Sequence, residues 1–176
     1  MARYRLAILL VLVLSAGVPP TASGQTRGNP AAMIATQRDA LTKLAFMDGV
    51  WRGTAWTILP NGEKHTVTQT ERVGPLIGGS VRVIEGRGYE TGGSLGFNAF
   101  AIISYDSNRS AYNMRSYAQG NVGDFALTLT DDGFVWEIPA GPATIRYTAV
   151  VKNGAWREIG DRIIPGKEPV RFFEMN

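Results

Sequence analysis

Apolar and polar residues alternate along most of the chain, in short runs that turn residues separate. The clearest run is 125–130, Phe-Ala-Leu-Thr-Leu-Thr, in which every second residue is large and apolar. A period of two is typical of a β-strand with one dry and one wet face. About ten such segments follow the N-terminal third, at 50–59, 64–73, 80–86, 97–105, 111–118, 125–130, 134–138, 144–152, 156–164 and 170–175.

The residues between these segments predict tight connections. Pro60-Asn61-Gly62, Asp131-Asp132-Gly133 and Asn153-Gly154 are strong turn signals, because glycine and asparagine readily adopt the positive φ angles that two-residue hairpins need. Each segment is therefore expected to pair with the next. The segment 97–105 is apolar at nearly every position, which predicts a strand that is covered on both faces.

One helix precedes the strands. Pro30 opens a pattern of helical period that runs to about Leu44, and Gly49 ends the region. Many short strands and a single helix predict an all-β domain. A two-sheet sandwich and a barrel both fit, but a meander of about ten strands favours one closed antiparallel barrel, because closure removes exposed edges. We expect Trp51 to seal one end, and the interior to be wide enough for one small ligand.

The first residues have the layout of an export signal. The first five residues contain two arginines, residues 6–18 are almost wholly apolar, and Ala22-Ser23-Gly24 are small. The apolar run is shorter than the ~20 residues of a membrane span. We therefore predict a signal peptide at 1–24, a single domain at 25–176, a periplasmic or secreted location, and no stable membrane anchor after cleavage.

Composition excludes several kinds of site. The chain has no cysteine and only one histidine, which rules out disulfides and thiolate ligands and predicts no metal site. The formal charge of +3 is spread along the chain, and part of it lies in the predicted signal peptide. We therefore expect no nucleic-acid partner. The chain is expected to be a monomer or a homodimer.

Candidate ligand-binding residues are polar or aromatic side chains on predicted strands. Arg115 and Tyr117 are two residues apart, so they share one face of their strand. If that face is interior, a guanidinium and a phenol grip an anionic or hydroxylated ligand; if it is exterior, the alternating set lines the cavity instead, namely Tyr112, Met114 and Ser116. Arg82 carries the same ambiguity. The full candidate set is Glu71, Arg82, Tyr105, Arg115, Tyr117 and Trp136.

Catalytic patterns are weak. Gly92-Gly93-Ser94-Leu95-Gly96 matches the serine nucleophile elbow in letters, but a strand follows it and the only histidine precedes it, so we interpret it as a glycine-rich loop. Five glutamates lie on predicted strands. Two of them converging inside a barrel could transfer protons, whereas ordinary cross-strand pairing would place them outside. They are Glu71, Glu85, Glu137, Glu158 and Glu174.

Several stretches resemble a known group of proteins. The opening Gly49-x-Trp51-x-Gly53 after a helix, the run Gln69-Thr70-Glu71-Arg72-Val73-Gly74-Pro75 and the run Gly133-Phe134-Val135-Trp136-Glu137-Ile138-Pro139 resemble lipocalin-like (calycin) barrels. The chain is similar to secreted bacterial members related to nitrobindin-like barrels. The resemblance spans nearly all of 25–176 and implies a ligand-holding barrel without an established activity. The C-terminal histidine that binds haem iron in nitrobindin-like barrels has no counterpart, because His65 lies in the second predicted strand.

Three functional hypotheses follow. The first is an exported lipocalin-like barrel that binds a small apolar or amphipathic molecule, with no catalytic residue and no cofactor. The second is an isomerase-like or cyclase-like enzyme that uses interior Glu, Arg and Tyr side chains for proton transfer. The third is a barrel with a filled core that serves stability or protein contacts.

Overall fold

The computed structural model describes residues 29–176, so the predicted signal peptide lies outside the described residues. The described chain begins with helix α1 (Pro30–Thr42) and a 3-10 turn, η1 (Ala45–Met47). Ten strands follow, with a second 3-10 turn, η2 (Ile77–Gly79), after the second strand. The strands are β1 (Gly49–Ile58), β2 (Lys64–Leu76), β3 (Val81–Tyr89), β4 (Leu95–Asp106), β5 (Ala111–Ala118), β6 (Asn121–Thr130), β7 (Gly133–Ala140), β8 (Ala143–Lys152), β9 (Ala155–Ile163) and β10 (Val170–Met175).

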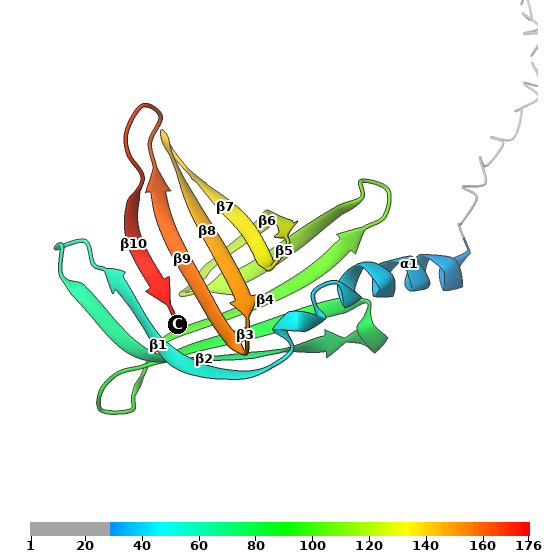
Figure 1. The fold of residues 1–176 in the computed structure, drawn as a ribbon, viewed down its shortest axis with the longest axis horizontal. Coiled ribbons are helices and arrows are strands. Elements are labelled where there is room, and N and C mark those ends of the chain that lie inside the picture. Colours follow the sequence, from blue (N-terminus) through cyan, green and yellow to red (C-terminus); the bar gives the residue numbers. More distant parts are fainter. Residues whose placement is uncertain (1–28) are drawn as a thin grey trace, which may run out of the picture.

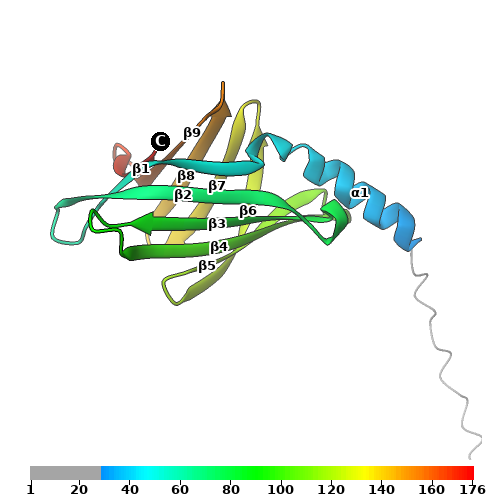
Figure 2. The same cartoon turned by 90° about the horizontal axis from the view of Figure 1, so that it is seen from below.

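The strands form one closed antiparallel barrel. Each strand pairs with the next in sequence, and β1 pairs with β10 to close the ring. This confirms the predicted all-β meander barrel with one N-terminal helix, and it excludes the two-sheet sandwich. Strands β1–β5 run along the long direction of the molecule, and β7–β10 cross them steeply (Figures 1 and 2).

The pairing is incomplete at two places in the wall. Strand β10 pairs with β1 only at residues Ala55, Trp56 and Thr57. Strand β6 pairs with β7 only from Leu127 to Thr130, so its first half has no partner on that side. These two seams have the shortest pairing in the wall, and at the first of them Thr54 and Asn176 add two backbone hydrogen bonds of 2.9 Å.

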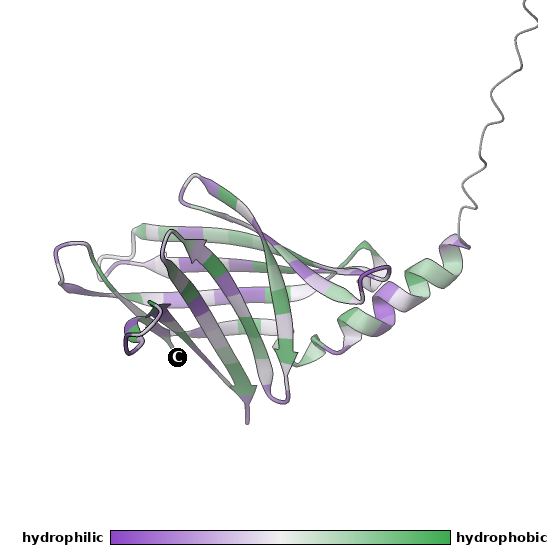
Figure 3. Cartoon of the chain, turned by 90° about the horizontal axis from the view of Figure 1, so that it is seen from above, coloured by the Kyte–Doolittle hydropathy of each residue, from purple (hydrophilic) through white to green (hydrophobic). Residues whose placement is uncertain are grey.

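Alternation along each strand divides the residues between the interior and the outer surface, as the banded colouring of the strands shows (Figure 3). The prediction that residues 97–105 are covered on both faces is wrong. Phe100 on β4 is 38% exposed, whereas its neighbour Ala101 is buried. The reason is the topology: a single closed sheet has no second layer, so even an apolar strand shows one face to solvent.

The C-terminal turn of α1 and η1 pack against one end of the barrel, which we call the closed end, while the rest of α1 projects away from it (Figure 2). Leu44 and Met47 are fully buried there, together with Ile103 and Phe134 from the strands. The indole Nε1 of Trp51 donates a 2.8 Å hydrogen bond to the carbonyl of Met47. Its ring also packs edge-on against Trp156 at 5.8 Å, so Trp51 lies at the sealed end, as expected.

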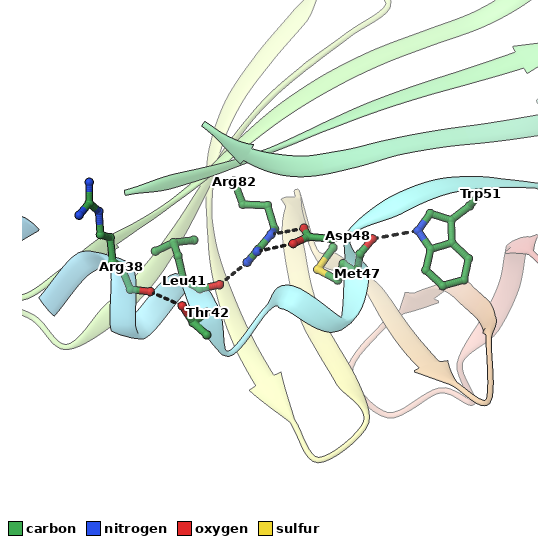
Figure 4. Close-up of polar contacts among 7 residues, drawn as sticks. All are labelled: Arg38, Leu41, Thr42, Met47, Asp48, Trp51 and Arg82. Carbon is green, nitrogen blue, oxygen red and sulfur yellow. Dashed lines mark hydrogen bonds and ion pairs between the residues drawn. The ribbon is translucent and has the colours of Figure 1, made fainter. Parts of the chain in front are cut away.

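A charged clasp fixes the closed end (Figure 4). The Arg82 guanidinium donates to both carboxylate oxygens of Asp48, at 2.7 Å and 2.9 Å, and also to the carbonyl of Leu41. The Tyr112 hydroxyl donates to the carbonyl of Ala40 at 2.8 Å. The carbonyls of Ala40 and Leu41 also accept backbone hydrogen bonds from Lys43 and Leu44, so these side chains add a second donor to each carbonyl and attach the end of α1 to the barrel.

Candidate functional site

The interior is packed at the closed end and less so beyond it. Inward-facing Phe134 and Ile103 near α1 have at most 2% of their surface exposed. Further along the barrel, inward-facing Trp136, Tyr147 and Glu158 are only half-buried, although they lie inside the wall. Inward positions there are often small, including Gly86, Ser116 and Gly160. We call this part of the interior, beyond the packed closed end, the cup; a closed barrel of this kind could hold a ligand there.

Glu71 lies inside this cup and is 8% exposed. The Gln69 side-chain amide donates a 2.7 Å hydrogen bond to its carboxyl oxygen. Across the pair of strands β2 and β3, Gly86 faces Glu71, and a Cβ at residue 86 would lie 2.8 Å from the carboxyl oxygen. The glycine thus makes the space in which the carboxyl fits.

Glu158 is the second interior carboxyl. The indole Nε1 of Trp136 donates to it at 3.2 Å. The indole nitrogen of Trp156, two residues earlier on the same face of β9, is buried without a hydrogen-bond partner within 29–176, yet it lies close enough to Glu158 to favour the carboxylate. Two indole N–H groups therefore lie near this one carboxyl group, and that of Trp136 is hydrogen-bonded to it.

Burial dominates the acidity of both groups. It raises the pKa of Glu158 to about 7 from its usual 4.5, against the opposing effect of the Trp136 and Trp156 donors. It also raises the pKa of Glu71 to about 7, where the Gln69 amide lowers it and the charge of Glu158 raises it further. The two carboxyls are thus close enough to repel each other, and each is poised between its acid and its carboxylate near neutral pH.

Aromatic rings form the wall beside Glu158. Trp136 and Tyr147 stack face to face at 4.3 Å, and Phe173 meets Tyr147 edge-on at 5.8 Å. Phe125 packs against the other side of Trp136 at 5.3 Å. Burial, followed by the charge of Glu158, raises the pKa of the Tyr147 phenol to about 12, so that phenol remains a proton donor.

Four of the six predicted ligand residues face inward, but not all are free to meet a ligand. Glu71 and Trp136 belong to the cup described above. Arg82 is 4% exposed and its guanidinium is engaged by Asp48, while Tyr105 packs against Tyr112 at 5.0 Å near the closed end.

Arg115 and Tyr117 lie on the outer surface, which settles the choice of strand face. Arg115 forms an ion pair with Asp124 at 2.9 Å and donates to the Tyr117 hydroxyl at 3.0 Å. The structure therefore corrects the interior alternative for these two residues. The inner face of β5 carries the other set, Tyr112, Met114 and Ser116.

The ligand-binding set predicted from the sequence left out three interior groups. They are Gln69, Tyr147 and Glu158. Glu158 was among five strand glutamates, and the structure separates them: Glu85, Glu137 and Glu174 pair with arginines on the outer side of the wall. One signal in the sequence indicated that Glu158 faces inward. Residues two apart on a strand share one face, so an inward-facing Trp156 at the closed end places Glu158 and Gly160 on the inner face as well.

A hollow lies in the wall, at the seam between β6 and β7. It is a cleft of about 740 Å³, and Phe125 and Trp136 contribute to its lining. Most of the other lining residues belong to the outer face, including Glu137 and Arg146, which pair with each other at 2.6 Å. Trp136 therefore lies between this cleft and Glu158.

The described residues show neither a metal site nor a membrane helix. Within 29–176, no three His, Cys, Asp or Glu side chains are grouped so that they could hold a metal ion. Over the same residues, no helix has both the length and the apolar character to cross a membrane.

Comparison with known proteins adds no relative. No protein-family model matches the chain, and a search of curated proteins gives no significant match. The closed ten-strand meander is compatible with a lipocalin-like fold.

Proposed function

We propose that this protein is a lipocalin-like barrel that binds a small apolar or amphipathic molecule in its interior. The observation that carries the proposal is the cup beyond the packed closed end, where the stacked Trp136 and Tyr147 lie beside two interior carboxyls. Aromatic walls with a few fixed polar groups are typical of small-molecule sites. In this proposal the protein acts after export, as a periplasmic or secreted monomer or homodimer.

A second candidate function is proton transfer on a bound substrate. Glu71 and Glu158 favour it, because a carboxyl whose pKa is near 7 serves as either acid or base at neutral pH. The Tyr147 phenol beside them is a proton donor. In this reading the residues that act are Glu71, Glu158 and Tyr147, and the reaction class is isomerisation or cyclisation of an apolar substrate.

The binding proposal is tested with the neutral apolar dye Nile red and a matched pair of variants. Ser116→Trp fills an inward position, and Thr128→Trp fills the cleft at the β6–β7 seam. Dye fluorescence should rise with the wild type and Thr128→Trp, and should be lost with Ser116→Trp at unchanged circular dichroism. Loss with Thr128→Trp alone would place the ligand in the outer cleft and refute the interior site.

The catalytic candidate has its own test. The molecule that native mass spectrometry detects on the purified protein is extracted and incubated with the protein in D₂O. Deuterium should enter the ligand with the wild type and fail to enter with Glu158→Gln. Equal exchange with both proteins, or none with either, would remove the enzyme reading and leave binding.

A further inference from the structure

The charges inside the cup are unbalanced. Arg82, the buried arginine, is engaged by Asp48 at the closed end, and the His65 ring forms its contact with Glu90, at 3.1 Å. Among residues 29–176 no basic side chain forms an ion pair or hydrogen bond with Glu71 or Glu158. A buried carboxylate is strongly destabilising unless it is paired. Neither interior carboxyl therefore has a basic partner among the described residues.

The polar groups around the carboxyls favour their ionised form without supplying that charge. Gln69 donates to Glu71, and Trp136 donates to Glu158. The Trp156 indole, on a side chain only 6% exposed, is a buried donor without a hydrogen-bond partner in 29–176, and it lies near Glu158. These neutral N–H donors hold carboxyl oxygens in fixed directions. These donors are an observation independent of the acidic pair. They favour a carboxylate, which in a buried site is stable only with a positively charged partner.

The surroundings select an organic cation over a metal ion. Calcium takes six to eight oxygen ligands and magnesium about six, and residues 29–176 offer no group of three acidic or histidine ligands. The walls beside Glu158 are instead aromatic rings, with Trp136 and Tyr147 stacked face to face and Phe173 edge-on to Tyr147. Aromatic rings bury the apolar body of an organic cation, which a metal ion lacks.

We propose that the ligand is an organic amine, with its ammonium group held between Glu71 and Glu158 and its apolar part against the stacked Trp136 and Tyr147. This inference rests on the proposed interior binding and names the class of ligand. The Trp136 indole donates to Glu158 and stacks on Tyr147, so it joins the charged and the apolar parts of the site.

The pH dependence follows from the two carboxyls. The other titratable group against them is the Tyr147 phenol, which stays protonated. No basic side chain among the described residues is paired with either carboxyl, and the buried Arg82 is paired with Asp48. Binding of an ammonium group requires carboxylates, and burial brings the pKa of both glutamates to about 7. Affinity for the amine should therefore rise as pH increases through about 7 and fall only when the amine itself loses its proton, at about pH 10.

The test compares three probes of similar shape by calorimetry with the full-length exported protein at about pH 8. The probes are 2-phenylethylamine, the neutral 2-phenylethanol and the anionic 3-phenylpropionate. The amine should bind at least about tenfold tighter than the alcohol, since each tenfold is about 1.4 kcal/mol, a modest charge interaction. Glu71→Gln and Glu158→Gln should each abolish most of that preference by weakening binding of the amine. Glu137→Gln, on the outer surface, is the matched control.

The outcomes separate this inference from interior binding itself. If Nile red binds the cup and the amine binds no better than the alcohol, or the preference survives Glu71→Gln/Glu158→Gln, the amine assignment is refuted and the proposed function stands. If Nile red does not depend on Ser116, the proposed function fails too. An amine preference that increases from about pH 6 to about pH 8 and disappears with the glutamine variants supports both.

Discussion

Replacing Glu158 by glutamine should stabilise the protein at alkaline pH and do little at acidic pH. Glutamine has nearly the same shape, keeps an oxygen that accepts the Trp136 hydrogen bond, and does not ionise. The perturbation therefore removes the titration of one interior group while it leaves the packing of the cup in place.

The magnitude follows from the pKa of this carboxyl, which burial raises from its ordinary 4.5 to about 7 in the folded chain. A folded-state pKa above the unfolded value means that the protonated group is compatible with folding. Stability is complete below about pH 4.5 and decreases as pH rises through about 7. The difference corresponds to about 3 kcal/mol, as an order of magnitude.

Urea unfolding, followed by tryptophan fluorescence, measures the effect at about pH 4 and about pH 8. The free energy of unfolding of Glu158→Gln relative to the wild type should increase by about 3 kcal/mol between these pH values. Glu137→Gln, whose parent carboxylate pairs with Arg146 on the outer surface, should change by less than about 1 kcal/mol. A pH-independent difference for Glu158→Gln would show that the carboxyl is solvated, and the reasoning about the cup would be refuted.

Three further outcomes are expected in urea unfolding at neutral pH. Asp48→Ala should lower the free energy of unfolding by about 3 to 5 kcal/mol, because it leaves the buried Arg82 charge without its partner; a loss below about 1 kcal/mol would contradict the clasp. Gly86→Ala should destabilise by about 1 to 3 kcal/mol, since its Cβ meets the Glu71 carboxyl at 2.8 Å, and adding Glu71→Ala should recover part of the loss. Phe134→Ala should destabilise by about 3 to 5 kcal/mol through a cavity at the closed end, where the ring is 2% exposed.

The strands and turns could be predicted from the sequence because their signals are local. The Asn153-Gly154 hairpin and the alternation in 125–130 are each readable within a few residues, and both appear as expected, in the turn between β8 and β9 and in β6. The barrel followed from the same evidence, since consecutive hairpins leave edges that only closure removes.

The membership of the site could not be predicted, because it depends on which face of each strand turns inward. A shift of one residue moves Arg115 and Tyr117 from the outer surface to the cup, and nothing within β5 decides between the two. The Arg82 clasp is likewise non-local, since its partner Asp48 is 34 positions away. These contacts exist only once neighbouring strands and the helix have fixed their relative positions.

The pair of interior glutamates argues against a barrel whose core serves stability alone. Leucine or glutamine at 71 and 158 would avoid the loss of about 3 kcal/mol that each buried carboxyl brings above neutral pH. Gly86 lowers the stability further, because a residue without a side chain contributes no packing and leaves the space to the Glu71 carboxyl. A chain that places two repelling acids behind aromatic walls, with neutral donors directed at them, lowers its own stability in a way that a bound cation would reverse by mass action. That coupling makes the cup, and not the outer cleft or the clasp, the part of the molecule where function is to be sought.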